Sequence, residues 1–207
     1  MSISIGIVDY GLSNLACVRS AVERLGYEAV VGSTPKLIKD ADKVILPGVG
    51  AYRDAMQNLN QLDLMNVLID EVIDNGKPFL GICLGAQLLA KDSDEFGGCE
   101  GLGWIDAHVR KLEPGKTGLR VPHTGWDDVE QLTQSILFDG LDKGALFYYT
   151  HSHGIFCEDD RVIAGTCDYG QKIVSVVQYG NIFATQFHPE KSQKDGLKLL
   201  DNFLRLS

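Results

Sequence analysis

The chain has 207 residues, 44% of them hydrophobic and 23% charged, so it is long and apolar enough to bury a sheet-and-helix core. Its formal net charge of -9 argues against a nucleic-acid partner, because phosphate backbones are bound by clustered Lys and Arg. No run reaches the roughly 18 apolar residues of a membrane span, and the opening "MSISIGIVDYG" lacks the pattern of a secretory signal, so we expect a cytoplasmic protein without a membrane partner.

The first half of the chain alternates between strand and helix patterns. Short apolar runs predict three buried strands, at residues 3–8, 43–48 and 79–82. Apolar side chains recur at helical spacing in residues 13–25, where Gly26 ends the pattern. They do so again in residues 64–72, before Gly76 and Pro78 break the chain. Strands separated by helices predict βαβ units around a parallel sheet.

The second half is richer in strand patterns. "KIVSVVQYGNIFATQF", residues 172–187, holds two β-rich runs around a turn and predicts a hairpin or meander at the sheet edge. A final amphipathic helix is marked by Leu197, Leu200, Phe203 and Leu204. No repeat or linker interrupts the chain, so we expect a single domain over residues 1–207. Its fold class is α/β, with a mostly parallel central sheet flanked by helices and an antiparallel edge portion.

The pentapeptide "GICLG" places Cys83 between two glycines at a predicted strand-to-helix turn. This pattern is the thiol counterpart of the Gly-x-Ser-x-Gly nucleophile elbow, in which small neighbours relieve the crowding of a strained turn. A thiol there lies at a helix N-terminus, where the helix dipole favours the reactive thiolate. The alternative is a small buried residue at a tight junction. The other cysteines (Cys17, Cys99, Cys157 and Cys167) form no CxxC pair or zinc-type spacing and are interpreted as structural.

A thiol nucleophile needs a base and a group that orients the base. In "ATQFHPEKS", Pro189 restricts His188 to an extended conformation, so His188 and Glu190 point to the same side. This arrangement predicts a Cys83–His188–Glu190 triad, and the alternative is a loop with a solvated charge.

Donors for an oxyanion are predicted in "PGVGAY", residues 47–52, where glycines free the backbone N–H groups around Gly48, Val49 and Gly50 to approach a ligand. The segment lacks the Gly-Lys-Ser/Thr ending of a phosphate loop, so nucleotide binding is the weaker interpretation.

Taken together, the motifs resemble those of class I, triad-type glutamine amidotransferases, and more narrowly the glutaminase subunits of imidazole glycerol phosphate synthases. The matching stretches extend from residue 9 to residue 203: "DYGLSNL", "PGVGAY", "GICLGAQLL", "VPHTGWDDV", "THSH" and "ATQFHPEKSQKDGLKLLDNF". The elbow and the His-Pro-Glu are shared by the whole class. The motifs "DYG" and "PHTGW" and the extended C-terminal stretch are what narrow the resemblance to the glutaminase subunits of imidazole glycerol phosphate synthases.

The resemblance implies roles for individual residues. Cys83 would form a glutamyl thioester, with His188 as acid and base and Glu190 as its orienting group. The backbone N–H of Leu84 would join segment 48–50 in the oxyanion hole. The implied glutamine-binding residues are Gln87, Glu95, His151 and Ser152. No cofactor is implied.

The resemblance also implies a partner, a (β/α)8-barrel cyclase subunit in a heterodimer, to which ammonia passes internally. The products would be imidazole glycerol phosphate and an aminoimidazole carboxamide ribotide. His123 and Trp126 would lie on the docking face, or else simply pack a turn. Three alternatives stay open: a paralogue that supplies ammonia for surface-sugar amidation, a stand-alone thiol hydrolase, and a non-catalytic interaction subunit.

Some positions depart from the family pattern. His153 stands where a Tyr is more common, and Thr124 and Asp127 vary the form "PHMGWN". These departures leave the triad intact but weaken the substrate assignment. His151 and His153 form an H-x-H pair, but no third ligand has matching spacing, so no metal site is expected.

Overall fold

A computed structural model describes residues 3–206. Five parallel strands form one half of its main sheet, and their order differs from their order in the chain. They are, in spatial order, β2 (Glu28–Gly32), β1 (Ser4–Val8), β3 (Lys43–Gly48), β4 (Phe79–Cys83) and β14 (Ile182–Thr185). The predicted strands at 3–8, 43–48 and 79–82 are confirmed, and so is the α/β fold class.

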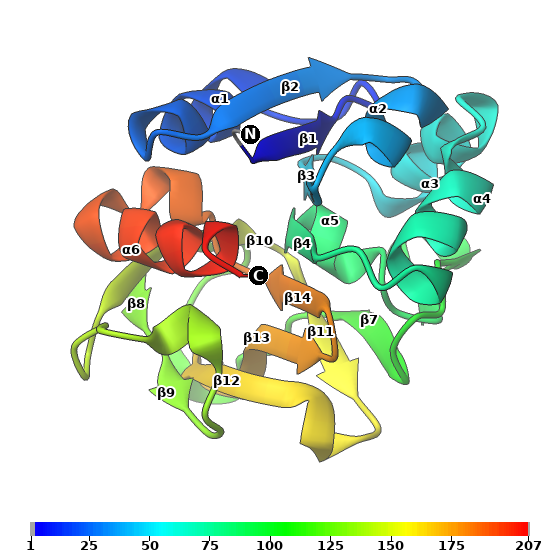
Figure 1. Cartoon of the computed structure of the whole chain (residues 1–207). Coiled ribbons are helices and arrows are strands. Elements are labelled where there is room, and N and C mark those ends of the chain that lie inside the picture. The colour runs from blue at the N-terminus through cyan, green and yellow to red at the C-terminus, as the bar shows by residue number, and fades with distance from the viewer. Residues whose placement is uncertain (1–2, 207) are drawn as a thin grey trace.

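Helices cover both faces of this parallel half (Figure 1). Their bounds are α1 (Leu15–Arg24), α2 (Pro35–Asp40), α3 (Tyr52–Gln61), α4 (Leu64–Leu68), the π-helix η1 (Ile69–Asp74), α5 (Leu84–Gln87) and α6 (Gln193–Leu204). Helices α1 and α6 pack on one face, against Ile5, Ile7 and Ile82, and α2, α3 and α4 pack on the other, against Val44 and Leu46. Burial on both faces explains why these strands are continuous apolar runs.

The helix ends follow the predicted signals. Helix α1 ends at Arg24, and Gly26 has a φ of 87°, the left-handed conformation that terminates many helices. The predicted helix around residues 64–72 is confirmed, although its second half, Ile69–Asp74, is a π-helix. No helix among residues 3–206 is long and apolar enough to cross a membrane.

The other half of the sheet is mostly antiparallel. Its strands are β13 (Lys172–Tyr179), β11 (His153–Cys157), β7 (Ala107–Lys111), β5 (Asp92–Ser93) and β6 (Cys99–Glu100); β12 (Ile163–Asp168) also pairs with β13, and β9 (Glu130–Gln131) pairs with β12. A separate antiparallel pair consists of β8 (His123–Asp128) and β10 (Leu146–His151). Short 3₁₀ helices connect these strands: η2 (Glu95–Gly97), η3 (Gly115–Thr117), η4 (Ile136–Phe138) and η5 (Asp160–Val162). A further 3₁₀ helix, η6 (Pro189–Lys191), connects β14 to α6.

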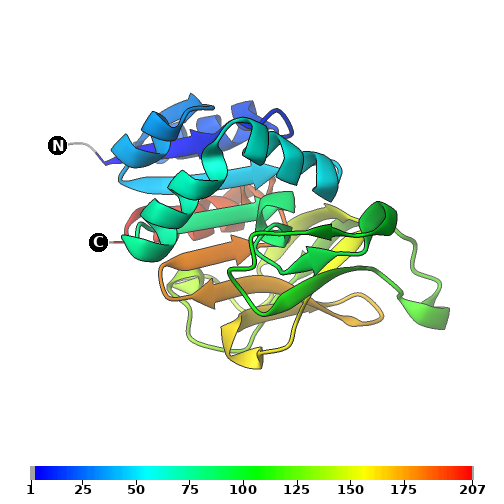
Figure 2. The same cartoon turned by 90° about the vertical axis from the view of Figure 1, so that its right-hand side faces the viewer.

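The predicted hairpin over residues 172–187 exists, but its predicted place at the sheet edge is wrong. Strand β14 lies between β4 and β13, where it joins the parallel half to the antiparallel half (Figure 2). All four residues of β14 and the centre of β13 are buried. The near-continuous apolar character of both runs, which differs from the alternation of a half-exposed strand, is consistent with this central position.

The topology brings three predicted segments to one edge of the sheet. Gly48 and Cys83 pair at the carboxyl ends of β3 and β4, and Thr185 ends β14 beside Ile82. Ligands of open α/β sheets bind at such carboxyl edges. The chain leaving β14 therefore delivers His188 to the edge that carries Cys83.

Candidate active site

Cys83 occupies a strained turn between β4 and α5. Its φ of 54° and ψ of -108° lie outside the regions that non-glycine residues ordinarily adopt. Such conformations cost about 1–3 kcal/mol and are found where the surrounding structure holds a functional side chain in place. The predicted elbow geometry is present.

The two flanking glycines are required by close backbone approach. A Cβ at Gly81 would lie 2.8 Å from the carbonyl oxygen of Gly85, and a Cβ at Gly85 would overlap the carbonyl oxygen of Leu46. Side chains at either position would therefore push α5 away from the sheet and displace Cys83. This explains the spacing of "GICLG" in physical terms.

His188 and Glu190 form a buried pair. His188 Nδ1 donates to Glu190 Oε1 at 2.8 Å, and both side chains are 2% exposed. The backbone N–H of His188 donates to the carbonyl of Tyr148 at 2.9 Å, which fixes the segment before Pro189. His188 Nε2 is buried and has no hydrogen-bond partner of ordinary geometry within residues 3–206, so it is left for Cys83 and a bound ligand. His188 and Glu190 meet as predicted, but the reason differs: His188 is extended, whereas Glu190 lies in a 3₁₀ helix, η6, so the contact does not come from strand alternation.

Burial of the His188 ring disfavours its charged form, but hydrogen bonding and charge from Cys83 and Glu190 outweigh burial and raise the pKa of His188 to about 9. A raised pKa means that the imidazolium is favoured in the folded protein. That is the state needed beside a thiolate and the state that donates a proton to a leaving group.

This pKa predicts a pH-dependent stability. Because the folded pKa of about 9 lies above the ordinary 6.5, the contribution to the unfolding free energy is complete below pH 6.5 and is lost as the pH rises through 9. The loss is on the order of 3 kcal/mol. In urea titrations we expect the wild-type unfolding free energy to fall more steeply between pH 6.5 and 9 than that of Glu190→Gln, which lacks one cause of the shift. Equal slopes for the two proteins would contradict the assignment.

A pocket of about 350 Å³ opens in front of Cys83. Most of the predicted site residues line it: Val49, Gly50, Cys83, Leu84, Gln87, Glu95, His151 and Ser152. Gly48, His188 and Glu190 lie outside this lining. Gly48 packs so closely on the Tyr10 hydroxyl that a Cβ there would overlap it.

The predicted oxyanion segment borders the pocket, but one of its N–H groups is already bound. The N–H of Val49 donates to the carbonyl of Leu12 at 2.8 Å. The N–H of Leu84, in contrast, belongs to the first turn of α5, where N–H groups have no partner inside the helix. Gly50 has a φ of 107°, a conformation that glycine adopts readily. The N–H of Leu84 therefore lies next to Cys83, whereas that of Val49 would face the pocket only after its peptide rotated.

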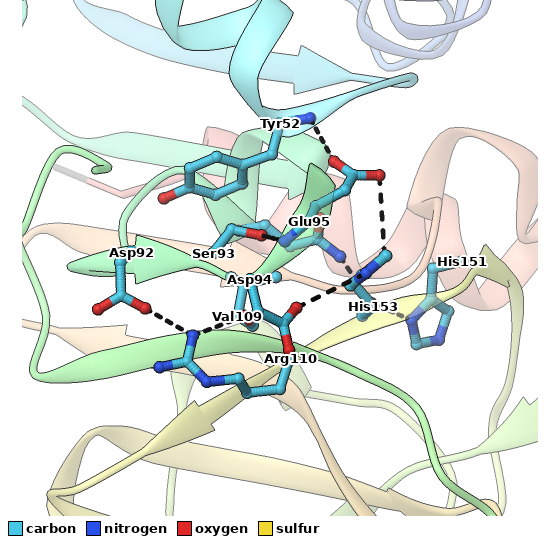
Figure 3. Close-up of polar contacts among 10 residues, drawn as sticks. Tyr52, Asp92, Ser93, Asp94, Glu95, Val109, Arg110, His151 and His153 are labelled. Atoms are coloured by element: carbon cyan, nitrogen blue, oxygen red, sulfur yellow. Dashed lines mark hydrogen bonds and ion pairs between the residues drawn. The ribbon is translucent and has the colours of Figure 1, made fainter. Parts of the chain in front are cut away.

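Glu95 connects the pocket to helix α3 (Figure 3). Its Oε2 accepts the N–H of Tyr52, the first residue of α3, at 2.7 Å. Its Oε1 lies 3.8 Å from Nδ1 of His153, whose Nε2 is 3.7 Å from Asp94 Oδ1. His153 thus lines the pocket between two carboxylates.

The sequence patterns missed several pocket residues. Thr150 and Pro122 also line it, and Gln186 Nε2 donates to Cys83 Sγ at 3.8 Å. Gln186 lies two residues before His188, but Gln186 and Phe187 form a bend after β14, so strand alternation is no signal for it. Pro122 and Thr150 carried no signal either.

The structure corrects the expectation for His123. Its ring is 1% exposed and stacks between Tyr149 and Tyr169, whereas Trp126 is 42% exposed. The two residues are three apart on β8, and side chains an odd number apart point to opposite faces of a strand. Only Trp126 is therefore available at the surface.

Comparison with known proteins agrees with this geometry. The model of the family "Glutamine amidotransferase class-I" matches residues 6–206. The chain is 46% identical over 202 residues to imidazole glycerol phosphate synthase subunit HisH 1 of Campylobacter jejuni, covering 98% of this chain and 100% of that protein. It is 45% identical to the HisH subunit of Geobacter sulfurreducens over 203 residues, covering 96% and 97% of the two chains.

Solved structures share the fold at lower identity. A structure titled PurLQS from Thermotoga maritima matches with a TM-score of 0.76 and 20% identity, covering 99% of this chain and 98% of that one. A glutamine amidotransferase from the same organism matches with a TM-score of 0.66 and 20% identity, covering 92% and 77%. With the family match over nearly the whole chain, these findings show that the chain belongs to the class I glutamine amidotransferases.

Proposed function

We propose that this chain is the glutaminase subunit of an imidazole glycerol phosphate synthase, hydrolysing glutamine to glutamate and ammonia for a partner subunit in histidine biosynthesis. The observation that carries the proposal is the strained Cys83 with the buried His188–Glu190 pair at the edge of a 350 Å³ pocket. The full-length similarity to HisH subunits supports the choice of branch.

The proposed reaction has two stages. The Cys83 thiolate attacks the side-chain amide carbon of glutamine, and His188 gives a proton to the departing ammonia, which leaves a glutamyl thioester. His188 then takes a proton from water, the hydroxide attacks the thioester carbon, and Cys83 leaves with glutamate released. Glu190 keeps a proton on Nδ1 of His188, so that Nε2 is the nitrogen that gives and takes the transferred proton. Glutamine and water are consumed, and glutamate and ammonia are formed.

The pocket offers groups suited to both ends of glutamine. The carboxylate of Glu95 and the amide of Gln87 suit the α-ammonium end, and the backbone at Ser152, with His151 beside it, suits the α-carboxylate end. The N–H of Leu84 meets the oxyanion, joined by Val49 once its peptide has turned. These roles are proposals supported by the lining of the pocket and by the family resemblance.

The proposed partner is a (β/α)8-barrel cyclase subunit in a heterodimer. Trp126, exposed and packed edge-on against Tyr148, offers an aromatic anchor of the kind that protein interfaces favour. We place the protein in the cytoplasm, as one glutaminase domain without a cofactor. Neither the cytoplasmic location nor the number of domains bears on the site chemistry.

The test is to purify the chain together with its cyclase and to measure glutamate release along with glutamine-dependent formation of imidazole glycerol phosphate. We expect both with the phosphoribulosyl substrate present. Glutamate release coupled only to a sugar-amidating partner would assign the surface-sugar branch instead. Full glutaminase turnover by the chain alone would indicate a stand-alone hydrolase, and no turnover in any complex would indicate a non-catalytic subunit.

Selective labelling tests the nucleophile directly. A glutamine-like diazo-ketone should modify Cys83 before the other four cysteines, because Cys83 combines the elbow with a neighbouring imidazole. Burial raises the pKa of Cys157 and that of Cys167 to about 12, so these thiols carry little thiolate at neutral pH. Peptide mapping by mass spectrometry reads the order of labelling. Modification of Cys17 or Cys157 before Cys83 would overturn the assignment.

A further inference from the structure

A buried chain of polar contacts begins at Asp127, a residue outside the proposed machinery. Asp127 Oδ2 lies 2.7 Å from Nε2 of His123, whose Nδ1 lies 3.1 Å from Nε2 of His151. His151 Nδ1 in turn donates to the backbone carbonyl of His153 at 2.8 Å (Figure 3). Both rings are buried, and the side chain of Asp127 is 38% exposed. The chain thus connects the surface of β8 to the lining of the glutamine pocket.

The same carbonyl continues the chain to the nucleophile. Gln87 Nε2 donates to the His153 carbonyl at 2.7 Å and to Gln186 Oε1 at 3.1 Å. Gln186 Nε2 then donates to Cys83 Sγ at 3.8 Å. Every polar group between Asp127 and Cys83 is therefore positioned by its neighbour.

The two rings do not carry enough protons for the three bonds that they make. A neutral imidazole has one N–H, so two neutral rings supply two donors, and an ionised carboxylate supplies none. His151 uses its N–H on the His153 carbonyl and accepts at Nε2, so His123 must donate from Nδ1. Its contact with Asp127 then needs a second proton on the same ring. A complete chain holds one proton in excess of two neutral histidines.

Asp127 is the group that favours this excess proton. Burial lowers the pKa of His123 below its ordinary value, and the hydrogen bond and charge of Asp127 offset this only in part. Burial lowers the pKa of His151 to about 3, and the positive charges of the neighbouring His123, His188 and His153 lower it further. The hydrogen bond to the His153 carbonyl acts in the opposite direction. Tyr149, Tyr169 and Cys167 also face the pair. The proton is therefore held against burial, and rising pH removes it.

A metal ion is a poorer explanation of the same geometry. The donor atoms of His123, Asp127 and Cys167 lie within 4.8 Å of one another, and these are zinc-type ligands. Two atoms bound tetrahedrally to one zinc ion at its usual bond lengths are about 3.4 Å apart. The 2.7 Å between His123 Nε2 and Asp127 Oδ2 is instead a direct hydrogen bond.

We propose that Asp127 is a positioning residue for glutamine hydrolysis, because it holds a shared proton on the His123–His151 pair and so fixes the His153 carbonyl on which Gln87 depends. This role rests on the proposed glutaminase activity but is separate from it, since the triad does not include Asp127. Loss of the proton breaks one link and frees the pocket wall to move.

Two substitutions at Asp127 separate this role from simple packing. In Asp127→Asn the side-chain amide donates to His123 Nε2, which completes the three bonds without an added proton. In Asp127→Ala the link is missing. With the cyclase partner present, we expect Asp127→Ala to lower kcat/KM for glutamine roughly 10- to 100-fold, the effect of one buried hydrogen bond to a charged group, mostly through KM. Asp127→Asn should remain within about threefold of wild type at pH 5, where wild type holds the excess proton.

The pH dependence is the decisive measurement. Raising the pH from 5 to 7.5 should lower the kcat/KM of wild type relative to that of Asp127→Asn, because only wild type depends on the excess proton and burial places the pKa of His123 below its ordinary value. Asp128→Asn and Asp128→Ala are matched controls: Asp128 is exposed, next along β8 on its opposite face, and both should match wild type at every pH. Two results would refute the proposal. One is a ratio of the kcat/KM of wild type to that of Asp127→Asn that does not change with pH, and the other is an equal loss of kcat/KM in Asp127→Asn and Asp127→Ala.

Histidine-selective 15N NMR of the isolated chain tests the proton without any activity. We expect doubly protonated nitrogen shifts from His123 at pH 5 that weaken as the pH is raised to 7.5 and are absent in Asp127→Asn, in metal-free buffer. A neutral His123 in wild type, or a signal that depends on added zinc, would overturn the assignment. Because this readout needs no turnover, its failure is distinct from a failure of the proposed function.

Discussion

Cys83→Ser should lower glutamine hydrolysis by roughly 1,000-fold or more, the scale of losses seen when a nucleophile is removed. The serine hydroxyl is far less ionised than a thiol, so the thioester route closes. The fold should stay intact, because Ser is nearly isosteric with Cys and the elbow depends on Gly81 and Gly85 for its close packing. Glutamate release by the chain in complex with its cyclase is the measurement.

The partner's reaction supplies the internal control. Added ammonium salts bypass the glutaminase site, so the Cys83→Ser complex should still form product from ammonia at near the wild-type rate. Cys157→Ser, at a half-buried thiol outside the pocket lining, is the matched cysteine variant and should retain glutamine-dependent activity. Near wild-type glutamate release by Cys83→Ser would remove Cys83 from the role of nucleophile.

Local patterns in the sequence are enough to predict the parts of the site that depend on backbone constraints. Glycines around Cys83 and the proline after His188 restrict the chain within a few residues, and the structure keeps both constraints. The strands at 3–8, 43–48 and 79–82 are predictable because burial on both faces leaves an unbroken apolar run. Each of these signals acts over a short stretch of chain.

Long-range contacts are beyond such patterns. The buried position of His123 follows from its stacking between Tyr149 and Tyr169. The central position of β14 in the sheet follows from its pairing with β4, which lies about a hundred residues earlier in the chain. The direction of the Val49 N–H depends on a carbonyl at Leu12. The spacing of apolar residues and the composition carry no information on which distant group a residue contacts. The sequence therefore indicated a flexible oxyanion segment, but not that its Val49 N–H is bonded to Leu12.

This bonded state of Val49 predicts a nearly silent chain that becomes active with its partner and the partner's ligand. In the structure the Val49 N–H is bound to the Leu12 carbonyl at 2.8 Å, so of the two predicted donors we expect Leu84 alone to be available to an oxyanion. Absence of one such donor typically costs about 100- to 1,000-fold in rate. Rotation of the peptide between Gly48 and Val49 would restore it, and the absence of a side chain on Gly48 lowers the steric cost. Low glutaminase activity in the lone chain also avoids making ammonia when no acceptor is bound.

The experiment compares glutamate release by the chain alone, with the cyclase, and with the cyclase and its phosphoribulosyl ligand. We expect a rise at each step, the largest on adding the ligand and of about 100- to 1,000-fold. The Val49 amide should be protected from hydrogen exchange in the lone chain and change its NMR shift only in the full complex, because the bond to Leu12 must break. Full activity with the Val49–Leu12 bond still present would refute this switch. A ligand response without any change at Val49 would place the activation elsewhere in the site.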